Sequence, residues 1–232
     1  MGKYHGVKTL EVLEGAEHYN DWIAQSLQSY IKSPALEIGA GTGNLSERFV
    51  SLGELVLTDV DPELVNILKK KFGKRKNITV EPFDVAAHIG KVTKHFATVY
   101  AINVLEHIND DNQALRNMKL LLAKEGRVVL LVPAKKFAFT KLDQKLGHHR
   151  RYEKKELRNK LEKAGFSVER LSFFNIVGLL SWLVRDKLSG DDKHLKKSHV
   201  KIFDSIVPLL RLIEPKNSLP LGISIIAVAK KK

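Results

Sequence analysis

The sequence predicts an α/β fold, in which one domain is built on a doubly wound, mostly parallel sheet. From Pro34 onward, short apolar runs alternate with segments whose apolar residues recur at helical intervals. Runs such as VVLLV are apolar on nearly every residue, which indicates strands that helices cover on both faces. The first five predicted strands are ALEIG, ELVLTD, NITVEPFD, FATVYAIN and GRVVLLV. The crossover helices between them are predicted at 45–52, 62–72 and 112–122.

Residues at the ends of the predicted helices support these assignments of strands and helices. Pro62 follows Asp61, a residue type that can cap the first turn of a helix. A further helix, 153–164, ends at Gly165, where a left-handed cap is expected. The strand FSVERLSFF follows it, and SLPLGISIIAVAKK contains the last strand.

Between these two strands the sequence predicts a long helical insertion, 175–217. It contains two apolar segments, FFNIVGLLSWLV and IFDSIVPLLRLI, separated by a basic polar stretch. Neither segment reaches the roughly 20 residues that span a bilayer. With Trp182 flanked by Arg185 and Lys187, the insertion could lie in a membrane interface, form a wall of a substrate pocket, or pack on the sheet edge.

Composition narrows the class of protein. A chain of 232 residues with 44% hydrophobic and 28% charged residues can bury one full core. The absence of cysteine excludes disulfides and thiolate chemistry. The polar N-terminus lacks the apolar core of a signal peptide, which predicts a cytoplasmic location. A net charge of +13 predicts attraction to an anionic partner, either nucleic acid or the inner leaflet of a membrane.

The strongest signal for a ligand site is LEIGAGTGNLSERF, at 36–49, where a strand runs into a glycine-rich turn and then a helix. Gly39, Gly41 and Gly43 let the backbone turn sharply and allow a ligand to approach closely. Their G-x-G-x-G spacing differs from the dinucleotide fingerprint, whose third glycine lies three positions after the second. The carboxylate of Glu37 would repel a pyrophosphate but could hold the ammonium of an amino acid. The motif therefore favours a nucleoside that carries an amino acid.

Polar residues also follow the next three predicted strands. Asp59 ends the second strand, where an acidic side chain can accept hydrogen bonds from ribose hydroxyls. After the third strand, Asp84 can accept from an exocyclic amine and Val85 offers a backbone N–H beside it, a pair that matches an adenine edge. Asn103 ends the fourth strand, at the carboxyl edge where ligands of open α/β folds bind. One ligand with an amino acid, a ribose and an adenine would fit all these positions.

These residues, in this order and followed by VLEHI at 104–108, resemble the class I S-adenosylmethionine-dependent methyltransferases over about 19–132. The resemblance implies a Rossmann-like sheet of seven strands with a reversed final hairpin, with S-adenosylmethionine as cofactor and S-adenosylhomocysteine as product. It also implies a single methyltransferase domain over 1–232. Its expected parts are an N-terminal helical cap at 1–33, a cofactor-binding core at 34–132, a lid or substrate loop at 133–152 and the insertion 175–217. The implied cofactor contacts are Tyr19, Asn20, Glu37, Gly39, Ala40, Gly41, Gly43, Asn44, Asp59, Val60, Asp84, Val85 and Asn103.

Methyl transfer is an in-line displacement, so a general base is needed only where the acceptor must lose a proton. His107 in VLEHI and His148 in LGHHRRY are the predicted catalytic residues, with His149 as an alternative to His148. A structural role is also open for each, because His107 could be a buried hydrogen-bond donor and the others part of an exposed lid. Some related O-methyltransferases use a glutamate three residues before the Glu-His pair as a metal ligand, whereas this chain has Asn103 there. We therefore expect no metal.

The expected acceptor is a small molecule or a lipid- or saccharide-linked compound that is methylated on oxygen. The second half of the chain, including KLGHHRRYEKKEL, resembles a bacterial and archaeal subgroup of class I enzymes that often accompany glycosyltransferases of lipid-linked saccharides. Arg150 and Arg151 could clamp a phosphate or carboxylate, and aromatics such as Phe137 and Phe173 could face an apolar group or fill the core. Peripheral association with an anionic membrane is expected. The alternatives are an RNA methyltransferase, favoured by the charge, and a protein that binds the cofactor without catalysis; the oligomeric state stays open.

Overall fold

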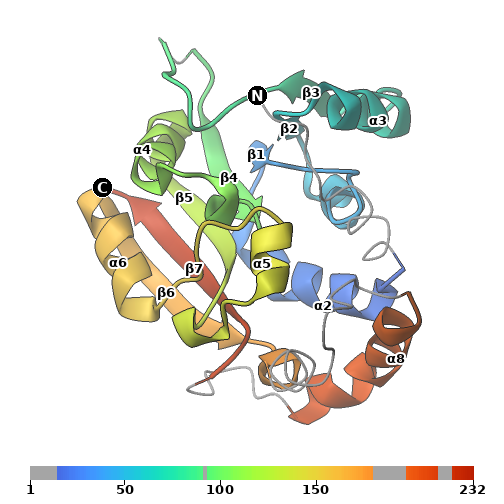
Figure 1. The fold of residues 1–232 in the computed structure, drawn as a ribbon. Coiled ribbons are helices and arrows are strands. Elements are labelled where there is room, and N and C mark those ends of the chain that lie inside the picture. The colour runs from blue at the N-terminus through green and yellow to red at the C-terminus, as the bar shows by residue number, and fades with distance from the viewer. Residues whose placement is uncertain (1–14, 91–92, 180–196, 214–220) are drawn as a thin grey trace.

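The computed structural model describes residues 15–90, 93–179, 197–213 and 221–232 (Figure 1). Its centre is a seven-stranded sheet with the strand order β3-β2-β1-β4-β5-β7-β6. The strands are β1 Ala35–Ile38, β2 Leu55–Asp59, β3 Ile78–Pro82, β4 Phe96–Ile102, β5 Leu122–Pro133, β6 Phe166–Phe174 and β7 Ser224–Lys231. Neighbouring strands from β3 to β5 are parallel, and β7 runs antiparallel to both β5 and β6. The predicted fold class, with its reversed last strand, is confirmed.

Helices cover both faces of this sheet, so each face has its own hydrophobic core. The helices are α2 Glu17–Leu27, α3 Pro62–Phe72, α4 Asp111–Leu121, α5 Lys141–Lys145, α6 Lys154–Lys163 and α8 Lys197–Ile213. The 3-10 helices are η1 Gln28–Tyr30, η2 Ser46–Leu52, η3 Leu105–His107 and η4 Lys136–Ala138. On β5, Val128 and Leu130 face the core that contains α4 and α6, whereas Val129 and Leu131 face the core that contains α2, α3 and α8. This alternation explains why VVLLV is apolar at every position.

The helix ends follow the predicted signals. The Asp61 side chain accepts a hydrogen bond from the backbone N–H of Glu63 at 2.8 Å, and Pro62 opens α3. Gly165 follows α6 with a φ of 89°, as expected for a left-handed cap. The predicted helix 45–52 is a 3-10 helix, η2, because apolar residues spaced three or four apart suit either kind of helix.

The segment 133–152 is more ordered than its sequence suggested. It contains η4 and α5, and an isolated bridge joins Ala134 to Tyr152. Helix α5 begins with a capping box, in which Thr140 and Asp143 exchange backbone and side-chain hydrogen bonds. Asp143 and Tyr152 are both fully buried, so this segment packs on the domain rather than lying loosely over it.

The predicted insertion before the last strand is described only in part. Its second apolar segment forms α8, whereas Trp182, Arg185 and Lys187 lie outside the described residues. Asp204 of α8 accepts hydrogen bonds from the backbone N–H groups of His18 and Tyr19, at 3.2 and 2.8 Å, in the first turn of α2. Helices α2 and α8 therefore pack together on one face of the sheet. Among the described residues, none of the helices has the length and apolar character that a bilayer span requires.

Candidate cofactor and acceptor site

The strand connections reverse direction between β1 and β4, and the glycine-rich turn leaves β1 at this point. Gly39, Gly41 and Gly43 all have positive φ values, of 69°, 60° and 74°. A Cβ on Gly39 would lie 2.6 Å from a methyl carbon of Val104, so no larger residue fits without displacing the segment after β4. The turn thus exposes backbone without side chains at the point where the strand order reverses. Open α/β sheets bind their ligands at this point.

Asp59 at the end of β2 forms a hydrogen bond with this turn. Its Oδ2 accepts a hydrogen bond from the backbone N–H of Gly41 at 2.9 Å, and its Oδ1 accepts one from Asp61 at 3.0 Å. Burial raises the pKa of the Asp59 carboxyl, while these backbone N–H groups lower it. Val60, the next residue, is an apolar side chain that remains half exposed beside it. The structure therefore brings Gly41, Asp59 and Val60 of the predicted set together.

Glu37 lies within β1 and is only 2% exposed. The hydroxyl of Tyr100 donates to its Oε2 at 2.9 Å. Burial raises the pKa of Glu37 from 4.5 to about 7, and no lysine or arginine of the described residues lies within ion-pairing distance. A buried carboxyl in this state would be stabilised as an anion by a ligand that carries a positive charge.

The predicted adenine contacts lie at the ends of the neighbouring strands. Asp84 follows β3, and its Oδ1 accepts from the backbone N–H of Ala86 at 2.8 Å. The Val85 side chain is buried in the core, so only its backbone could face a ligand. Asn103 follows β4, is exposed and has a left-handed φ of 53°. A non-glycine residue in this conformation is uncommon outside sites where the surroundings require it.

Helix α2 carries the remaining predicted contacts, Tyr19 and Asn20. The Tyr19 ring packs near Phe174 and Phe203, with ring centroids 6.3 and 5.8 Å away, and Asn20 is buried.

Arg48 ties this helix to the glycine-rich turn. It forms an ion pair with Asp21 of α2 at 2.6 Å and donates to the backbone oxygen of Asn44 at 3.0 Å. The amide of Ala40 donates to Thr58 of β2 at 2.8 Å. Helix α2 therefore lies against the turn; its role as a cap over the cofactor stays a prediction.

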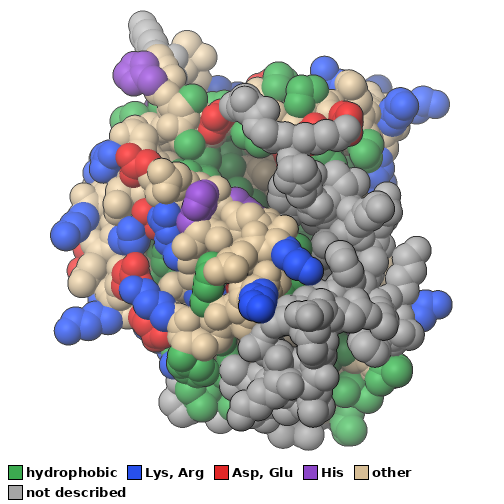
Figure 2. Space-filling model, in the orientation of Figure 1, with side chains coloured by type: hydrophobic (Ala, Val, Ile, Leu, Met, Phe, Trp, Pro, Cys, Tyr) green, Lys and Arg blue, Asp and Glu red, His purple; other side chains and the backbone are tan. Residues whose placement is uncertain are grey.

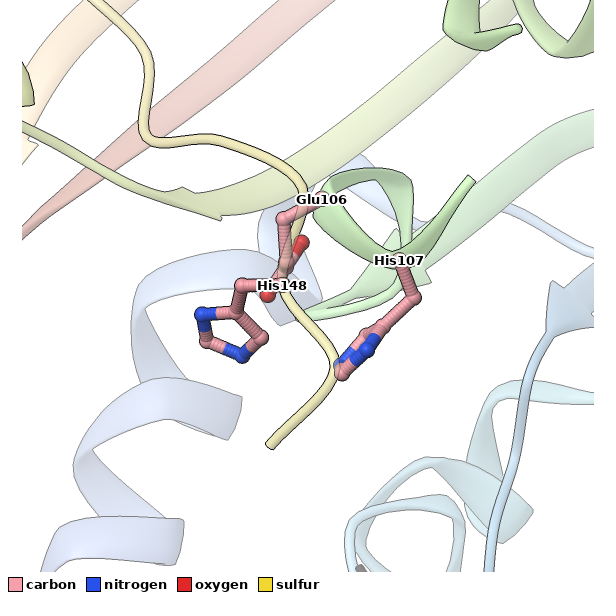
Figure 3. Close-up of side chains that lie close together, drawn as sticks. All are labelled: Glu106, His107 and His148. Atoms are coloured by element: carbon pink, nitrogen blue, oxygen red, sulfur yellow. The ribbon is translucent and has the colours of Figure 1, made fainter. Parts of the chain in front are cut away.

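A second group of side chains gathers after β4, where η3 meets the segment that follows α5 (Figure 3). One ligand atom from each of Glu106, His107 and His148 lies within 4.8 Å of the others. The two imidazole rings are 4.7 Å apart and nearly perpendicular. The structure thus brings together the two histidines that the sequence predicted to be catalytic, and Figure 2 shows histidine side chains near the middle of this face of the molecule.

Glu106 and His107 both have environments that disfavour charge. Glu106 is fully buried, and neither of its carboxylate oxygens has a hydrogen-bond partner in the described part of the chain. Burial raises its pKa from 4.5 to about 7, and burial also lowers the pKa of His107 from 6.5 to about 4. Buried polar atoms without partners are rare in native proteins and are found at sites that bind or react.

His148 is held from its other side by Asp143 of α5. The two are joined at 2.8 Å between His148 Nδ1 and Asp143 Oδ1, and Asp143 has no exposed surface. Arg151 also donates to Asp143, from Nε at 3.0 Å and from Nη2 at 3.0 Å. Burial alone would raise the pKa of Asp143, but the hydrogen bond from His148 and the charge of Arg151 hold it below its ordinary value.

This geometry contradicts the interpretation of Arg150 and Arg151 as an anion clamp and adds two residues to the site. Arg151 is 2% exposed and bonded to Asp143, and Arg150 is paired with Asp111 at 2.8 Å, so neither is the free anion clamp that the sequence suggested. Glu106 and Asp143 were not singled out as functional from the sequence. The capping-box spacing of Thr140 and Asp143 is the one local signal that could have drawn attention to α5. The prediction that no metal binds stays a prediction, although the donor atoms of Glu106, His107 and His148 could hold an ion.

Comparison with known proteins finds similarity in the first half of the chain. Residues 36–128 match the family model described as a methyltransferase domain. One curated relative is the probable ribosomal RNA small subunit methyltransferase A of Methanococcoides burtonii, 36% identical over 28% of this chain and 24% of its own length. Another is the ubiquinone biosynthesis O-methyltransferase of Pelagibacter ubique, 34% identical over 39% of this chain and 38% of its own length. The chain thus spans well under half the length of these curated relatives.

Solved structures match over nearly the whole chain. A SAM-dependent methyltransferase of Thermotoga maritima has a TM-score of 0.67 at 15% identity, covering 97% of this chain and 95% of its own. The N-methyltransferase NodS of Bradyrhizobium japonicum, solved with S-adenosyl-L-homocysteine, has a TM-score of 0.58 at 15% identity, covering 93% and 85%. At these identities the likeness is one of fold. Residues 36–128 thus match a methyltransferase-domain model, and the chain as a whole has the fold of the class I S-adenosylmethionine-dependent methyltransferases.

Proposed function

We propose that this chain is an S-adenosylmethionine-dependent methyltransferase that acts on a hydroxyl group of a small-molecule or lipid-linked acceptor. The observation that carries the proposal is the group formed by Gly41, Asp59 and buried Glu37 at the switch point of the sheet. The methyltransferase-domain match over residues 36–128 supports the same cofactor.

The residues present fit this cofactor. The Asp59 carboxylate accepts only backbone N–H groups in the described structure, so its remaining lone pairs suit ribose hydroxyls. Half-exposed Val60 offers an apolar surface to an adenine, and Glu37 offers a buried carboxylate to the ammonium of the methionine part. When bound, S-adenosylmethionine supplies an activated methyl group on a sulfonium sulfur. Tyr19 and Asn20 would cover the methionine end from α2.

His148 is the proposed general base, and His107 lies beside it as a neutral ring. A pKa of about 4 keeps His107 uncharged at neutral pH, so it adds no positive charge next to a sulfonium. Proton removal from an acceptor hydroxyl by a positioned imidazole contributes typically 10²–10⁴-fold in rate. A second candidate for the same cluster is a divalent metal ion on Glu106, His107 and His148, favoured by the unpartnered oxygens of Glu106. Metal analysis of the purified protein, with a melting-temperature series in Mg²⁺, Mn²⁺ and Zn²⁺, separates the two.

We also propose that α8 places the enzyme on an anionic membrane at the cytoplasmic face. Ile202, Ile206 and Leu209 form an exposed apolar stripe on α8, at 65, 43 and 61% exposure, next to exposed Lys201. The net charge of +13 favours anionic lipid. Co-sedimentation with phosphatidylserine vesicles should fall when Ile202 and Leu209 are replaced by serine, and should not change in a control variant, Ile67→Ser on α3.

RNA is the alternative anionic partner, favoured by the ribosomal RNA methyltransferases among the curated relatives. If RNA is the acceptor, its affinity should fall steeply with salt concentration. Vesicle binding without salt-sensitive RNA binding would favour the lipid-linked acceptor, and the reverse result would favour RNA.

The cofactor assignment is tested by calorimetric titration with S-adenosylmethionine, S-adenosylhomocysteine and NAD. We expect the first two to bind and NAD not to bind. Asp59→Asn should weaken S-adenosylmethionine at least tenfold, because it removes the charge and one acceptor at the ribose position. Asp110→Asn is the matched control, since the Asp110 carboxylate also accepts a backbone N–H, but at the start of α4 rather than at the glycine-rich turn. An equal loss of S-adenosylmethionine affinity in both variants, or binding of NAD alone, would contradict the assignment.

A further inference from the structure

We infer that Asp143 is a positioning residue that fixes the proton of His148 on Nδ1 and leaves Nε2 as the basic atom of the site. The inference rests on the proposed role of His148 as general base. It concerns a residue that lies outside the cofactor half and outside every segment matched to the methyltransferase-domain model.

The argument begins with the hydrogen bond between the two side chains. Asp143 Oδ1 and His148 Nδ1 are 2.8 Å apart, and the carboxylate has no exposed surface. An ionised carboxylate can only accept, so the proton of this bond belongs to Nδ1. The in-plane directions of the two ring nitrogens diverge across Cε1, so Nε2 of the neutral ring then carries a lone pair that does not point at Asp143.

Asp143 is itself held so firmly that it cannot turn away from the histidine. Its Oδ2 accepts the backbone N–H of Thr140 at 2.8 Å, and Arg151 donates to it through two nitrogens. Arg151 is buried as well, and it also donates to the backbone oxygen of Ala134 at 3.3 Å. The buried cation keeps Asp143 ionised, and thus able to accept from His148.

The local sequence explains how His148 comes to lie next to Asp143. Thr140 and Asp143 form the capping box that starts α5, a helix of only five residues. Gly147, with a φ of 80°, reverses the chain after the helix, a conformation that glycine adopts without strain. The backbone N–H of His148 then donates to the backbone oxygen of Asp143 at 2.9 Å, so backbone and side chain are both paired. The stretch TKLDQKLGH therefore builds the dyad locally.

The chemical consequence concerns the proton of the acceptor. The acceptor hydroxyl gives its proton to Nε2 as its oxygen bonds the methyl carbon, while the carbon–sulfur bond breaks and its electron pair stays on sulfur. His148 then carries protons on both nitrogens, and the Asp143 carboxylate stabilises this imidazolium. Without Asp143, a neutral His148 could carry its proton on Nε2 and would be unable to accept another there.

The tautomer of His148 can be measured without knowing the acceptor. ¹⁵N-histidine-labelled protein at pH 8 should show His148 with a protonated Nδ1 and an unprotonated Nε2; a His148→Gln variant identifies its signals. Arg151 and His148 both bond Oδ1 of Asp143, so the test variant removes the whole acceptor. In Asp143→Ala no acceptor remains beside Nδ1, and the proton should move to Nε2. Asp110→Ala is the control and should leave the tautomer unchanged.

Three results would overturn the inference: a wild-type His148 protonated on Nε2, a folded Asp143→Ala variant with an unchanged tautomer, or an equal change in Asp110→Ala. If Asp143→Ala does not fold, the wild-type spectrum alone decides. Calorimetric binding of S-adenosylmethionine is measured on the same samples. Failure of binding with the expected tautomer counts against the proposed function alone, whereas normal binding with the opposite tautomer counts against Asp143 alone.

Discussion

Glu37 should make the unliganded protein less stable as pH rises. Its pKa is about 7 in the fold against an ordinary 4.5, and the residue is fully buried. The folded state therefore holds the proton more tightly than the unfolded chain. The associated stability is fully present below pH 4.5 and is lost as pH rises through 7. Integrated over this window, ionised Glu37 costs about 3 kcal/mol at pH 8 and less than about 1 kcal/mol at pH 5.

Glu37→Gln removes this pH-dependent cost. The amide oxygen can still accept from the Tyr100 hydroxyl, so the hydrogen bond now made to Oε2 is retained. Relative to wild type, the variant should gain about 2 to 3 kcal/mol more in free energy of unfolding at pH 8 than at pH 5. Urea denaturation of both proteins at the two pH values measures this difference directly.

Two comparisons make the experiment decisive. The exposed carboxylate of Glu54 provides the control variant Glu54→Gln, whose effect should be equal at pH 5 and pH 8. Saturating S-adenosylmethionine should reduce the pH-dependent gap, because an ammonium next to Glu37 favours its ionised form. A Glu37→Gln effect that is the same at both pH values would refute the reasoning, since it would mean that the fold does not raise the pKa of Glu37 above its value in the unfolded chain.

Three further changes have expected outcomes. Gly39→Ala should destabilise the fold by about 1–3 kcal/mol in urea denaturation, because φ is 69° there and the added Cβ meets Val104; an unaffected midpoint would show that the turn adjusts. Asp204→Ala should cost about 1 kcal/mol and speed amide exchange in the first turn of α2, because it removes the acceptor of two helix N–H groups; unchanged exchange there would contradict this role. Asp59→Asn should leave the free energy of unfolding within about 1 kcal/mol of wild type while weakening the binding of S-adenosylmethionine, since the amide can still accept from Gly41. Loss of the folded state would show that the residue is mainly structural.

The sheet could be predicted because its signals are local. The runs VVLLV and ELVLTD are buried on both faces, so their composition alone identifies central parallel strands. The positions after β1, β2 and β4 followed from strand order, and the bond between Gly41 and Asp59 confirms that two of them meet. Their contacts with the cofactor stay predictions.

The residues around His148 could not be predicted in the same way. Glu106 stands next to His107, but a sequence does not reveal that both Glu106 oxygens are buried without partners among the described residues. Arg151 looked like a free surface cation, because its buried partner Asp143 becomes visible only when α5 is built. The packing of α8 on α2 depends on a hydrogen bond between residues 185 positions apart, and no local sequence pattern reveals such a contact.

That contact has a consequence for how the protein is made. During synthesis, helix α2 emerges early, yet the carboxylate that satisfies its first N–H groups belongs to Asp204, near the other end of the chain. Strand β7, which separates β5 from β6, is added later still. A ribosome-bound chain that stops at β5 would have the glycine-rich turn, Asp59 and the Arg48–Asp21 ion pair to α2, but not the acceptor of the first N–H groups of α2. We therefore expect the nascent protein to bind S-adenosylmethionine fully only after α8 has been synthesised, when Asp204 can accept from the first turn of α2.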